Sequence, residues 1–391
     1  MKVSATAASR LTPPGPDSFG SRLRSAAVAA RVGLWLGVCF GLAMATGLIS
    51  HYAQQPSQPV PFPTHPAWGY RVTQWLHVAS GTAAIPLLLV KLWVVFPRLL
   101  ERPPRTLRRL ALTVLERGSI AILVASAITQ LTTGLLNVSQ WYAWGFSFRR
   151  THYALAFVTI GALLIHIAVK LPVIRDVLGI DIDATMHDRP SARHHGALSR
   201  RGLLRLSWIA AGTAVLTSTV GTMPGLSRLS VLAPRSRAEG IPINRTAADA
   251  QVTTTATSPD YRCEVTYADQ RLVLTRDDLL GFTQHTHTLP IACVEGWSVA
   301  GRWTGPRLRD VLAATGAPPG RDVRVSSLQQ HGGSRVTILP ADFVDDERTL
   351  LALALDGEPL SLDHGYPARL IAPNRPGALQ TKWVARIEVL G

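Results

Sequence analysis

Long apolar stretches in the first 225 residues constrain this chain more than any other feature. Five of them are found, at 27–50, 71–96, 117–138, 150–174 and 203–224. Each is long enough to cross a bilayer, which takes about 20 residues of helix. Because lipid offers no hydrogen-bond partners to an open backbone, they predict an α-helical transmembrane bundle of about five spans in a lipid bilayer.

The charge of the chain is distributed unevenly. The formal net charge is +15, and residues 1–225 hold 22 Lys+Arg against 7 Asp+Glu, whereas residues 226–391 hold 18 of each. The basic excess therefore accompanies the apolar stretches. This distribution is typical of membrane topology and not of a nucleic-acid-binding surface, so we expect no nucleic-acid partner.

The basic residues also alternate between the connections. Segments 97–118 and 175–205 carry six arginines each, and segments 51–70 and 139–148 carry no Lys or Arg. Positive residues stay in the cytoplasm, so we expect the N-terminus inside and the two uncharged loops outside. Five spans then place the rest of the chain outside the cell membrane.

The remaining residues predict a compact α+β domain after a linker rich in Pro, Ser, Thr and Ala. Strand-like runs lie at 262–267 and 335–338, and helix-like runs at 276–281 and 305–315. The predicted organisation is a cytoplasmic tail (1–26), a four-helix transmembrane bundle resembling cytochrome b (27–175), a basic cytoplasmic loop (176–202), a fifth span (203–224), a linker (225–259) and the α+β domain (260–391).

Two blocks in this last domain indicate a site. Cys293 stands in IACVEGWS, and the run HGYPARLIAPNRPGALQTKWV occupies 364–384. A lone cysteine between apolar neighbours is usually a packed thiol. Of the other two cysteines, Cys39 lies in an apolar span and Cys263 in an alternating strand-like run. Cys293 is therefore the candidate metal ligand, and the second block is the candidate grip on a phosphate-bearing cofactor.

The end of the chain resembles a known family. The elements CVEGW at Cys293, the run 303–312, DGEPL at 356–360, HGYPARL and KWV follow one another over about 240–391. In this order they resemble the molybdopterin-binding domain of the sulfite oxidase superfamily, which includes the periplasmic methionine sulfoxide reductase catalytic subunit. The shared order is far more specific than any single element.

The resemblance implies a molybdenum cofactor and a set of residues around it. Cys293 takes the position of the thiolate ligand to molybdenum, beside the two dithiolene sulfurs of the pterin. The implied cofactor-binding residues are Asn244, Ser326 (or Ser327), His364, Arg369, Gln380, Thr381 and Lys382. Each has a structural alternative when taken alone, such as a surface salt bridge for Arg369 or a turn histidine for His364.

The family pattern is incomplete. The chain ends nine residues after Lys382, so we expect no additional dimerisation domain of the kind found in many sulfite oxidases. The segment with their active-site tyrosine and their arginine-X-histidine element are not recognised either. These departures weaken a sulfite-oxidising interpretation and leave the small-molecule substrate open.

The run SRRGLLR at 199–205 precedes the fifth span and resembles a twin-arginine export signal. A molybdopterin domain folds around its cofactor in the cytoplasm, which favours export of a folded domain. The alternative is a pair of ordinary arginines on the cytoplasmic side of a span.

Histidines within the predicted spans are candidate haem ligands, because ionisable groups inside a membrane are costly. His77 in the second span and His152 in the fourth lie at similar depth, near the outer face. His166 lies 14 residues after His152, about 21 Å along the same face of a helix, but has no partner at its depth. Two interpretations stay open: a b-type haem held by His77 and His152, or an anchor or quinone site in which these histidines hydrogen-bond between helices.

The sequence as a whole predicts a membrane-anchored molybdopterin oxidoreductase with an extracytoplasmic site. It would transfer an oxygen atom to or from a small molecule and exchange electrons through the bundle by way of quinone or haem b. The alternative is a membrane cytochrome or anchor protein whose outer domain is a non-catalytic binding module.

Overall fold

The computed structural model describes residues 15, 18–57, 59, 62–101, 104–189, 192, 196–219, 229–232 and 240–391. The chain divides into two compact units, one made of Met1–Met44 and Ala79–Thr217 and the other of Ala45–Val78 and Ser218–Gly391. Much of the predicted tail 1–26 and part of the predicted linker 225–259 lie outside the described residues.

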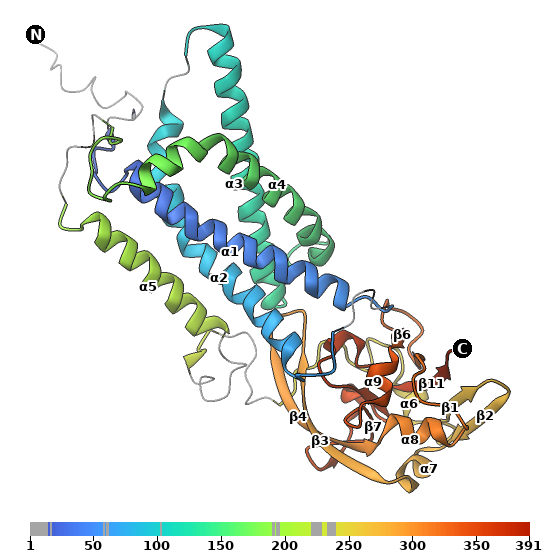
Figure 1. Cartoon of the computed structure of the whole chain (residues 1–391). Helices are drawn as coiled ribbons and strands as arrows, with labels where there is room; N and C mark the ends of the chain where they lie inside the picture. Colours follow the sequence, from blue (N-terminus) through green and yellow to red (C-terminus); the bar gives the residue numbers. More distant parts are fainter. Residues whose placement is uncertain are drawn as a thin grey trace, which may run out of the picture. The chain divides into compact units, whose positions relative to one another are not determined.

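Four helices of the described chain are long and apolar enough to cross a membrane. They are α1 (Ala26–Ala53), α2 (Gly69–Val95, continued by the 3-10 turn η3, Phe96–Leu100), α3 (Leu107–Val138) and α4 (Phe148–Leu178) (Figure 1). Large apolar side chains such as Leu34, Leu115 and Ile165 are exposed on them. This composition is compatible with lipid around the helices and confirms the predicted helical N-terminal region.

The predicted fifth span is a helix but does not reach the length and apolarity of the other four. It is α5 (Arg200–Thr219), and only four of the described helices qualify as candidate spans. Arginines occupy its first two turns, and serine, threonine and glycine recur through the rest. The expectation of five spans is therefore corrected to four candidate spans followed by α5. Residues 220–224 of the predicted span lie outside the described residues.

The first unit is held by apolar packing between helices. Val28, Val32 and Leu36 of α1 share a buried cluster with Ala84 and Leu87 of α2. Helices α3 and α4 run side by side (Figure 1).

Arg200, the first arginine of the SRRGLLR run, is 4% exposed, and its Nη1 donates to the carbonyls of Ile182 (2.9 Å) and Ala184 (3.0 Å). In the folded chain this arginine is therefore a structural residue. Its role as an export signal stays a prediction.

The second unit contains the α+β domain. A five-stranded sheet has the order β2-β1-β11-β5-β6, in which β1 is parallel to β11 and the other pairs are antiparallel. Its strands are β1 (Cys263–Tyr267), β2 (Gln270–Leu274), β5 (Val323–Ser327), β6 (Val336–Leu339) and β11 (Val384–Val389). Alternate residues such as Cys263 and Val265 point into the core, which is the period-2 pattern of a strand with one buried face.

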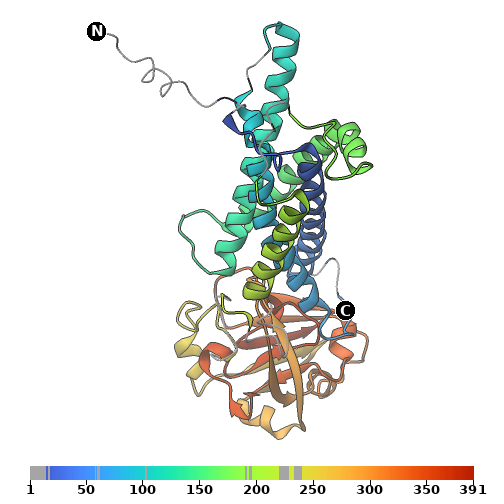
Figure 2. The same ribbon diagram turned by 90° about the vertical axis from the view of Figure 1, so that its left-hand side faces the viewer.

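Two smaller sheets complete the domain. One has the order β3-β4-β8-β9 and the other pairs β10 with β7, and the long β3–β4 hairpin is prominent in Figure 2. The strands are β3 (Gln284–Ala292), β4 (Ser298–Pro306), β7 (Leu350–Ala352), β8 (Ala354–Leu355), β9 (Glu358–Pro359) and β10 (Arg369–Ile371). Short helices connect them: α6 (Thr253–Thr257), α7 (Arg276–Gly281), α8 (Leu308–Ala313), α9 (Ala341–Asp345), η7 (Leu362–His364) and η8 (Gly377–Leu379). The predicted strands at 262–267 and 335–338 correspond to β1 and β6, and the predicted helices to α7 and α8, within a few residues.

Candidate functional site

Cys293 lies at the tip of the β3–β4 hairpin. Its backbone N–H donates to the Trp297 carbonyl (2.9 Å), and its carbonyl accepts from the N–H of Gly296 (3.1 Å). Gly296 adopts a φ of +83°, a conformation that favours glycine, and a Cβ there would lie 2.6 Å from Val78 Cγ2. The turn is therefore defined by backbone geometry, and it holds a thiol that is 3% exposed and lies 3.5 Å from the Asn244 amide nitrogen.

Cys263 has a different environment. It is fully buried in the core of the five-stranded sheet, and burial raises the pKa of its thiol to about 12. A thiol is a metal ligand as the thiolate, which this environment disfavours. Cys263 is thus a packed free thiol, and Cys293 stays the candidate ligand.

A buried arginine and a half-buried lysine form the basic part of the site. Lys382 Nζ donates to the carbonyls of Asp363 (2.6 Å) and Arg245 (2.9 Å), and burial together with Arg369 lowers its pKa to about 7. Arg369 is 4% exposed, and burial lowers its pKa to about 9. Its Nη1 donates to the His364 carbonyl (3.0 Å). Keeping either side chain protonated in this environment therefore costs free energy, and a bound anion would offset that cost.

Gly365 explains why the two cations are close neighbours. It has a φ of +114°, and a Cβ there would lie 3.2 Å from Arg369 Cβ and 3.3 Å from Lys382 Cα. The backbones of the two segments also pair, since Leu370 N donates to the Thr381 carbonyl (2.9 Å). The HGYPARL element therefore brings its arginine beside the KWV element by a turn that requires glycine.

His364 is fixed on both sides of its ring. Its Nε2 lies 3.0 Å from the Ile241 carbonyl and its Nδ1 lies 2.8 Å from Ser361 Oγ. A carbonyl only accepts, so Nε2 carries the proton and Nδ1 accepts from the serine. Burial lowers the pKa of His364, which favours the neutral ring at pH 7.

Three other predicted residues organise the backbone around Lys382. The Gln380 side chain accepts from Ala372 N (2.8 Å) and donates to the Ala372 carbonyl (3.1 Å). The Thr381 hydroxyl lies 3.1 Å from that of Thr337. Ser326 lies on β5, and the next residue, Ser327, donates from Oγ to the Lys382 carbonyl (2.7 Å). Their geometry is that of residues that shape a site, and their predicted contacts with a cofactor stay predictions.

These residues match the chemistry of a phosphate-bearing metal cofactor. In the described part of the chain, the hydrogen bonds of Arg369 and Lys382 all go to backbone carbonyls, and the buried Nε of Arg369 has no partner. Asn244 lies beside the Cys293 sulfur, and its neighbour Arg245 accepts from Lys382 Nζ, so the thiol and the lysine belong to one site. A thiolate for a thiophilic metal and nearby cations for a phosphate fit molybdopterin.

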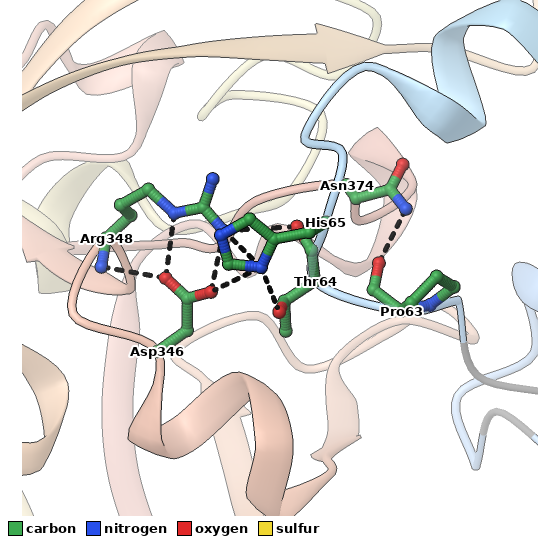
Figure 3. Close-up of polar contacts among 6 residues, drawn as sticks. All are labelled: Pro63, Thr64, His65, Asp346, Arg348 and Asn374. Carbon is green, nitrogen blue, oxygen red and sulfur yellow. Dashed lines mark hydrogen bonds and ion pairs between the residues drawn. The ribbon is translucent and has the colours of Figure 1, made fainter.

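Sequence reasoning missed the contribution of the segment between α1 and α2. Asn374 accepts at Oδ1 from Tyr70 N (2.5 Å) and donates from Nδ2 to the Pro63 carbonyl (2.6 Å). Nearby, Arg348 pairs with Asp346 (2.7 Å) and donates to the Thr64 carbonyl (3.2 Å) (Figure 3).

Tyr70 extends this contact toward the thiol. It packs against Ala292, the neighbour of Cys293. The absence of charge from 51–70 was the only hint in the sequence that this segment lies against the domain.

His77 and His152, two of the three candidate haem ligands, each have a hydroxyl partner and a glycine beside the ring. His77 Nδ1 lies 3.4 Å from Thr46 Oγ1, and a Cβ on Gly47 would lie 2.9 Å from the ring. His152 Nδ1 lies 3.1 Å from Thr133 Oγ1, on α3. His77 belongs to one compact unit and His152 to the other, and His166 lies on α4 with His152.

Comparison with known proteins assigns the C-terminal part of the chain. Residues 250–391 match the oxidoreductase molybdopterin-binding domain. The chain is 32% identical over 163 residues to the mitochondrial sulfite oxidase of Mus musculus, covering 33% of this chain and 29% of that protein. It is 30% identical over 121 residues to the uncharacterized oxidoreductase YuiH of Bacillus subtilis, covering 31% of this chain and 60% of that protein.

A solved structure, the sulfane dehydrogenase SoxCD from Paracoccus pantotrophus, is 28% identical with a TM-score of 0.30, covering 33% of this chain and 38% of that chain. The matched residues cover 29% of the mouse sulfite oxidase, so this chain spans less than a third of the length of that protein.

Proposed function

Since residues 250–391 are an oxidoreductase molybdopterin-binding domain, we propose that this chain is a membrane-anchored enzyme that transfers an oxygen atom to or from a small molecule. The observation that carries the proposal is the pairing of Cys293, at the tip of a hairpin, with the buried Arg369 and the half-buried Lys382, whose hydrogen bonds go to backbone carbonyls in the described part of the chain. When bound, molybdopterin supplies the redox and oxygen-transfer chemistry.

The roles of the residues follow from their contacts. Cys293 would bind molybdenum, with the Asn244 amide oriented toward its sulfur. Arg369 and Lys382 would bind the phosphate of the pterin, which raises the pKa of Lys382 from about 7 and keeps it protonated. His364 would stay neutral and present its carbonyl to Arg369. The burial of Cys293 and Arg369 limits competition from water for their bonds.

The site is proposed to face the extracytoplasmic side. The positive-inside rule puts the loop at 51–70 outside, because it carries no Lys or Arg. This same loop bonds to the domain, where Ile338 N donates to the Pro56 carbonyl (2.9 Å) and Asn374 binds Pro63. A domain that is bonded to an outer loop lies on the outer side whatever the number of spans.

Electron exchange through the helices is the remaining part of the proposal. His77 and His152 are candidate haem b ligands by sequence, and each has a hydroxyl at its Nδ1 atom, a kind of partner that metal-binding histidines commonly have. Quinone at the helices would then be the membrane partner.

Molybdenum content tests the central claim. We expect about one molybdenum per chain in protein purified from its native membrane, and a loss of at least tenfold in Cys293→Ser, because a serine oxygen is a poor substitute for a soft thiolate. Cys263→Ala is the matched control and should retain the metal. Sulfite, sulfoxides and oxyanions are then screened as substrates with the loaded protein. Wild-type protein without molybdenum, or Cys293→Ser with full content, contradicts the proposal and favours a non-catalytic outer domain.

A further inference from the structure

Arg375 is a buried cation that the site described above does not use. Its side chain is 1% exposed, and its Nη2 donates to the Ile338 carbonyl of β6 (2.9 Å). Its Nε and Nη1 are enclosed and have no hydrogen-bond partner in the described part of the chain. Burial lowers the pKa of this guanidinium to about 9. Buried charges are normally paired or hydrogen-bonded, so two donors of this group lack the acceptors that a buried cation requires.

The backbone of Arg375 is held next to the strand that leads to Cys293. Pro376 forms a parallel bridge with Ala292, and a Cβ on Gly377 would lie 3.0 Å from the Ala292 carbonyl oxygen. Only a glycine lets the two segments approach so closely. The position of residue 375 is therefore tied to the position of the candidate metal ligand.

The residue before Arg375 fixes the turn from the other side. Asn374 has a φ of +51° and is bonded across more than 300 residues of sequence to Tyr70 and to Pro63, the second of which Figure 3 shows. The Arg375 carbonyl also accepts from Gln380 Nε2 (3.4 Å). A guanidinium that is pre-positioned by its backbone on both sides loses little freedom when it binds.

We propose that Arg375 binds an anionic oxygen group through its Nε and Nη1 donors, next to the strand that leads to Cys293. The inference rests on the proposed function. The bound oxygens come from the cofactor phosphate or from an oxyanion substrate, and both present the acceptors that a planar guanidinium recognises. No acidic side chain forms an ion pair with Arg375 among the described residues, so an external anion supplies the missing charge.

Two variants of Arg375 and one control distinguish the cofactor phosphate from an oxyanion substrate as the bound anion. Arg375→Lys keeps the charge and loses the planar donors, and Arg375→Met keeps the bulk and loses both. Arg324→Gln is the control, because it removes a charge from the same domain at a surface pair with Glu388 (2.8 Å). All are purified as the full chain in detergent. Molybdenum is measured by mass spectrometry and pterin by the fluorescence of its released oxidised form, and the affinity for sulfate is measured from the quenching of tryptophan fluorescence.

If the cofactor phosphate is the ligand, both Arg375 variants contain about 10- to 100-fold less molybdenum and pterin, and Arg324→Gln is normal. If a substrate oxyanion is the ligand, the cofactor content is normal and sulfate binds about 10- to 100-fold more weakly. Normal content together with unchanged sulfate affinity overturns the proposal and leaves Arg375 as a structural bond to β6.

A measurement on the wild type decides the case in which the variants do not fold. Hydrogen exchange of the peptides covering 370–380 and 336–339 is compared with and without 50-fold excess sulfate, and with and without bound cofactor. Protection of these peptides by either anion supports the proposal, and no protection by either overturns it. Wild-type protein without molybdenum refutes the proposed function but leaves the sulfate comparison decisive for Arg375.

Discussion

Removing the Asn374 side chain should release the segment between α1 and α2 from the domain. Tyr70 lies in the first turn of α2, where backbone N–H groups have no partner within the helix. Asn374, 2% exposed, supplies that partner from 304 residues away, at 2.5 Å, and also binds the Pro63 carbonyl at 2.6 Å. It caps this helix as a local N-cap residue would.

The magnitude follows from the burial of the two partners. Tyr70 is 1% exposed, so its unpaired N–H would cost about 1–3 kcal/mol. Pro63 is exposed, and water can replace the lost donor, so that bond contributes about 0.5–1.5 kcal/mol. Asn374→Gly should therefore lower the free energy of local opening by about 2–4 kcal/mol, which corresponds to about 30- to 700-fold faster exchange.

Three substitutions at this position separate the contributions. Glycine adopts the φ of +51° without strain, so Asn374→Gly reports the hydrogen bonds alone. Asn374→Ala should cost about 1 kcal/mol more, because alanine is strained at positive φ. Asn374→Asp keeps the acceptor for Tyr70 and loses the donor to Pro63, so it should cost least. The assay is hydrogen exchange of peptides covering 62–76 in detergent-solubilised protein.

The structure also supplies a control position for the Asn374 variants and a result that would refute the capping of α2. Asp356 also has a positive φ (+53°), in the turn between β8 and β9, and Asp356→Gly should leave peptides 62–76 unchanged. If Asn374→Gly accelerates exchange of these peptides by less than threefold, or if Asn374→Asp is as severe as Asn374→Ala, Asn374 does not cap α2.

Three further predictions concern the site and the helices. The folded-state pKa of Lys382, about 7, lies below its ordinary 10.5, so cofactor-free protein should gain up to about 5 kcal/mol of stability as pH rises from 7 to 10.5. Below pH 7 the full free-energy cost of enclosing the charged lysine is present. Lys382→Gln should remove this pH dependence from the free energy of unfolding measured in urea. Gly365→Ala should cost about 1–3 kcal/mol and lower molybdenum content, because its Cβ would press on Arg369 at positive φ; full molybdenum content would argue against this turn. His77→Ala and His152→Ala should each abolish a reduced-minus-oxidised haem spectrum, and a flat wild-type spectrum would exclude haem.

Local patterns in the sequence were sufficient for the elements themselves. Apolar runs specify helices because a helix satisfies its backbone within the segment, and α1–α4 form where those runs lie. Alternation at Cys263 and Val265 specifies a strand with one buried face. The order of the elements from CVEGW to KWV indicated the molybdopterin domain, which the comparison confirms.

Several features depended on contacts between distant residues. The helix α5 is a separate case, because it is not among the helices apolar enough to be candidate spans, and the prediction of a fifth span overestimated its apolarity. The difference between Cys263 and Cys293 is one of enclosure, because both have apolar neighbours in sequence and only one is packed in the core of the five-stranded sheet. The partners of Gln380 are backbone atoms that no residue pattern identifies.

The sequence by itself determined which segments are helical, where the basic charge lies and which kind of cofactor the last domain holds. Hydropathy, periodicity and motif order are properties of neighbouring residues, so they can be read along the chain. Only the tertiary structure decided that Asn374 caps α2, that Tyr70 lies against the strand of Cys293 and that Arg375 is buried with two unpaired donors. These depend on which backbone and side-chain atoms meet between segments distant in sequence, and such pairing is set by the packing of the whole unit and not by the identity of any residue alone.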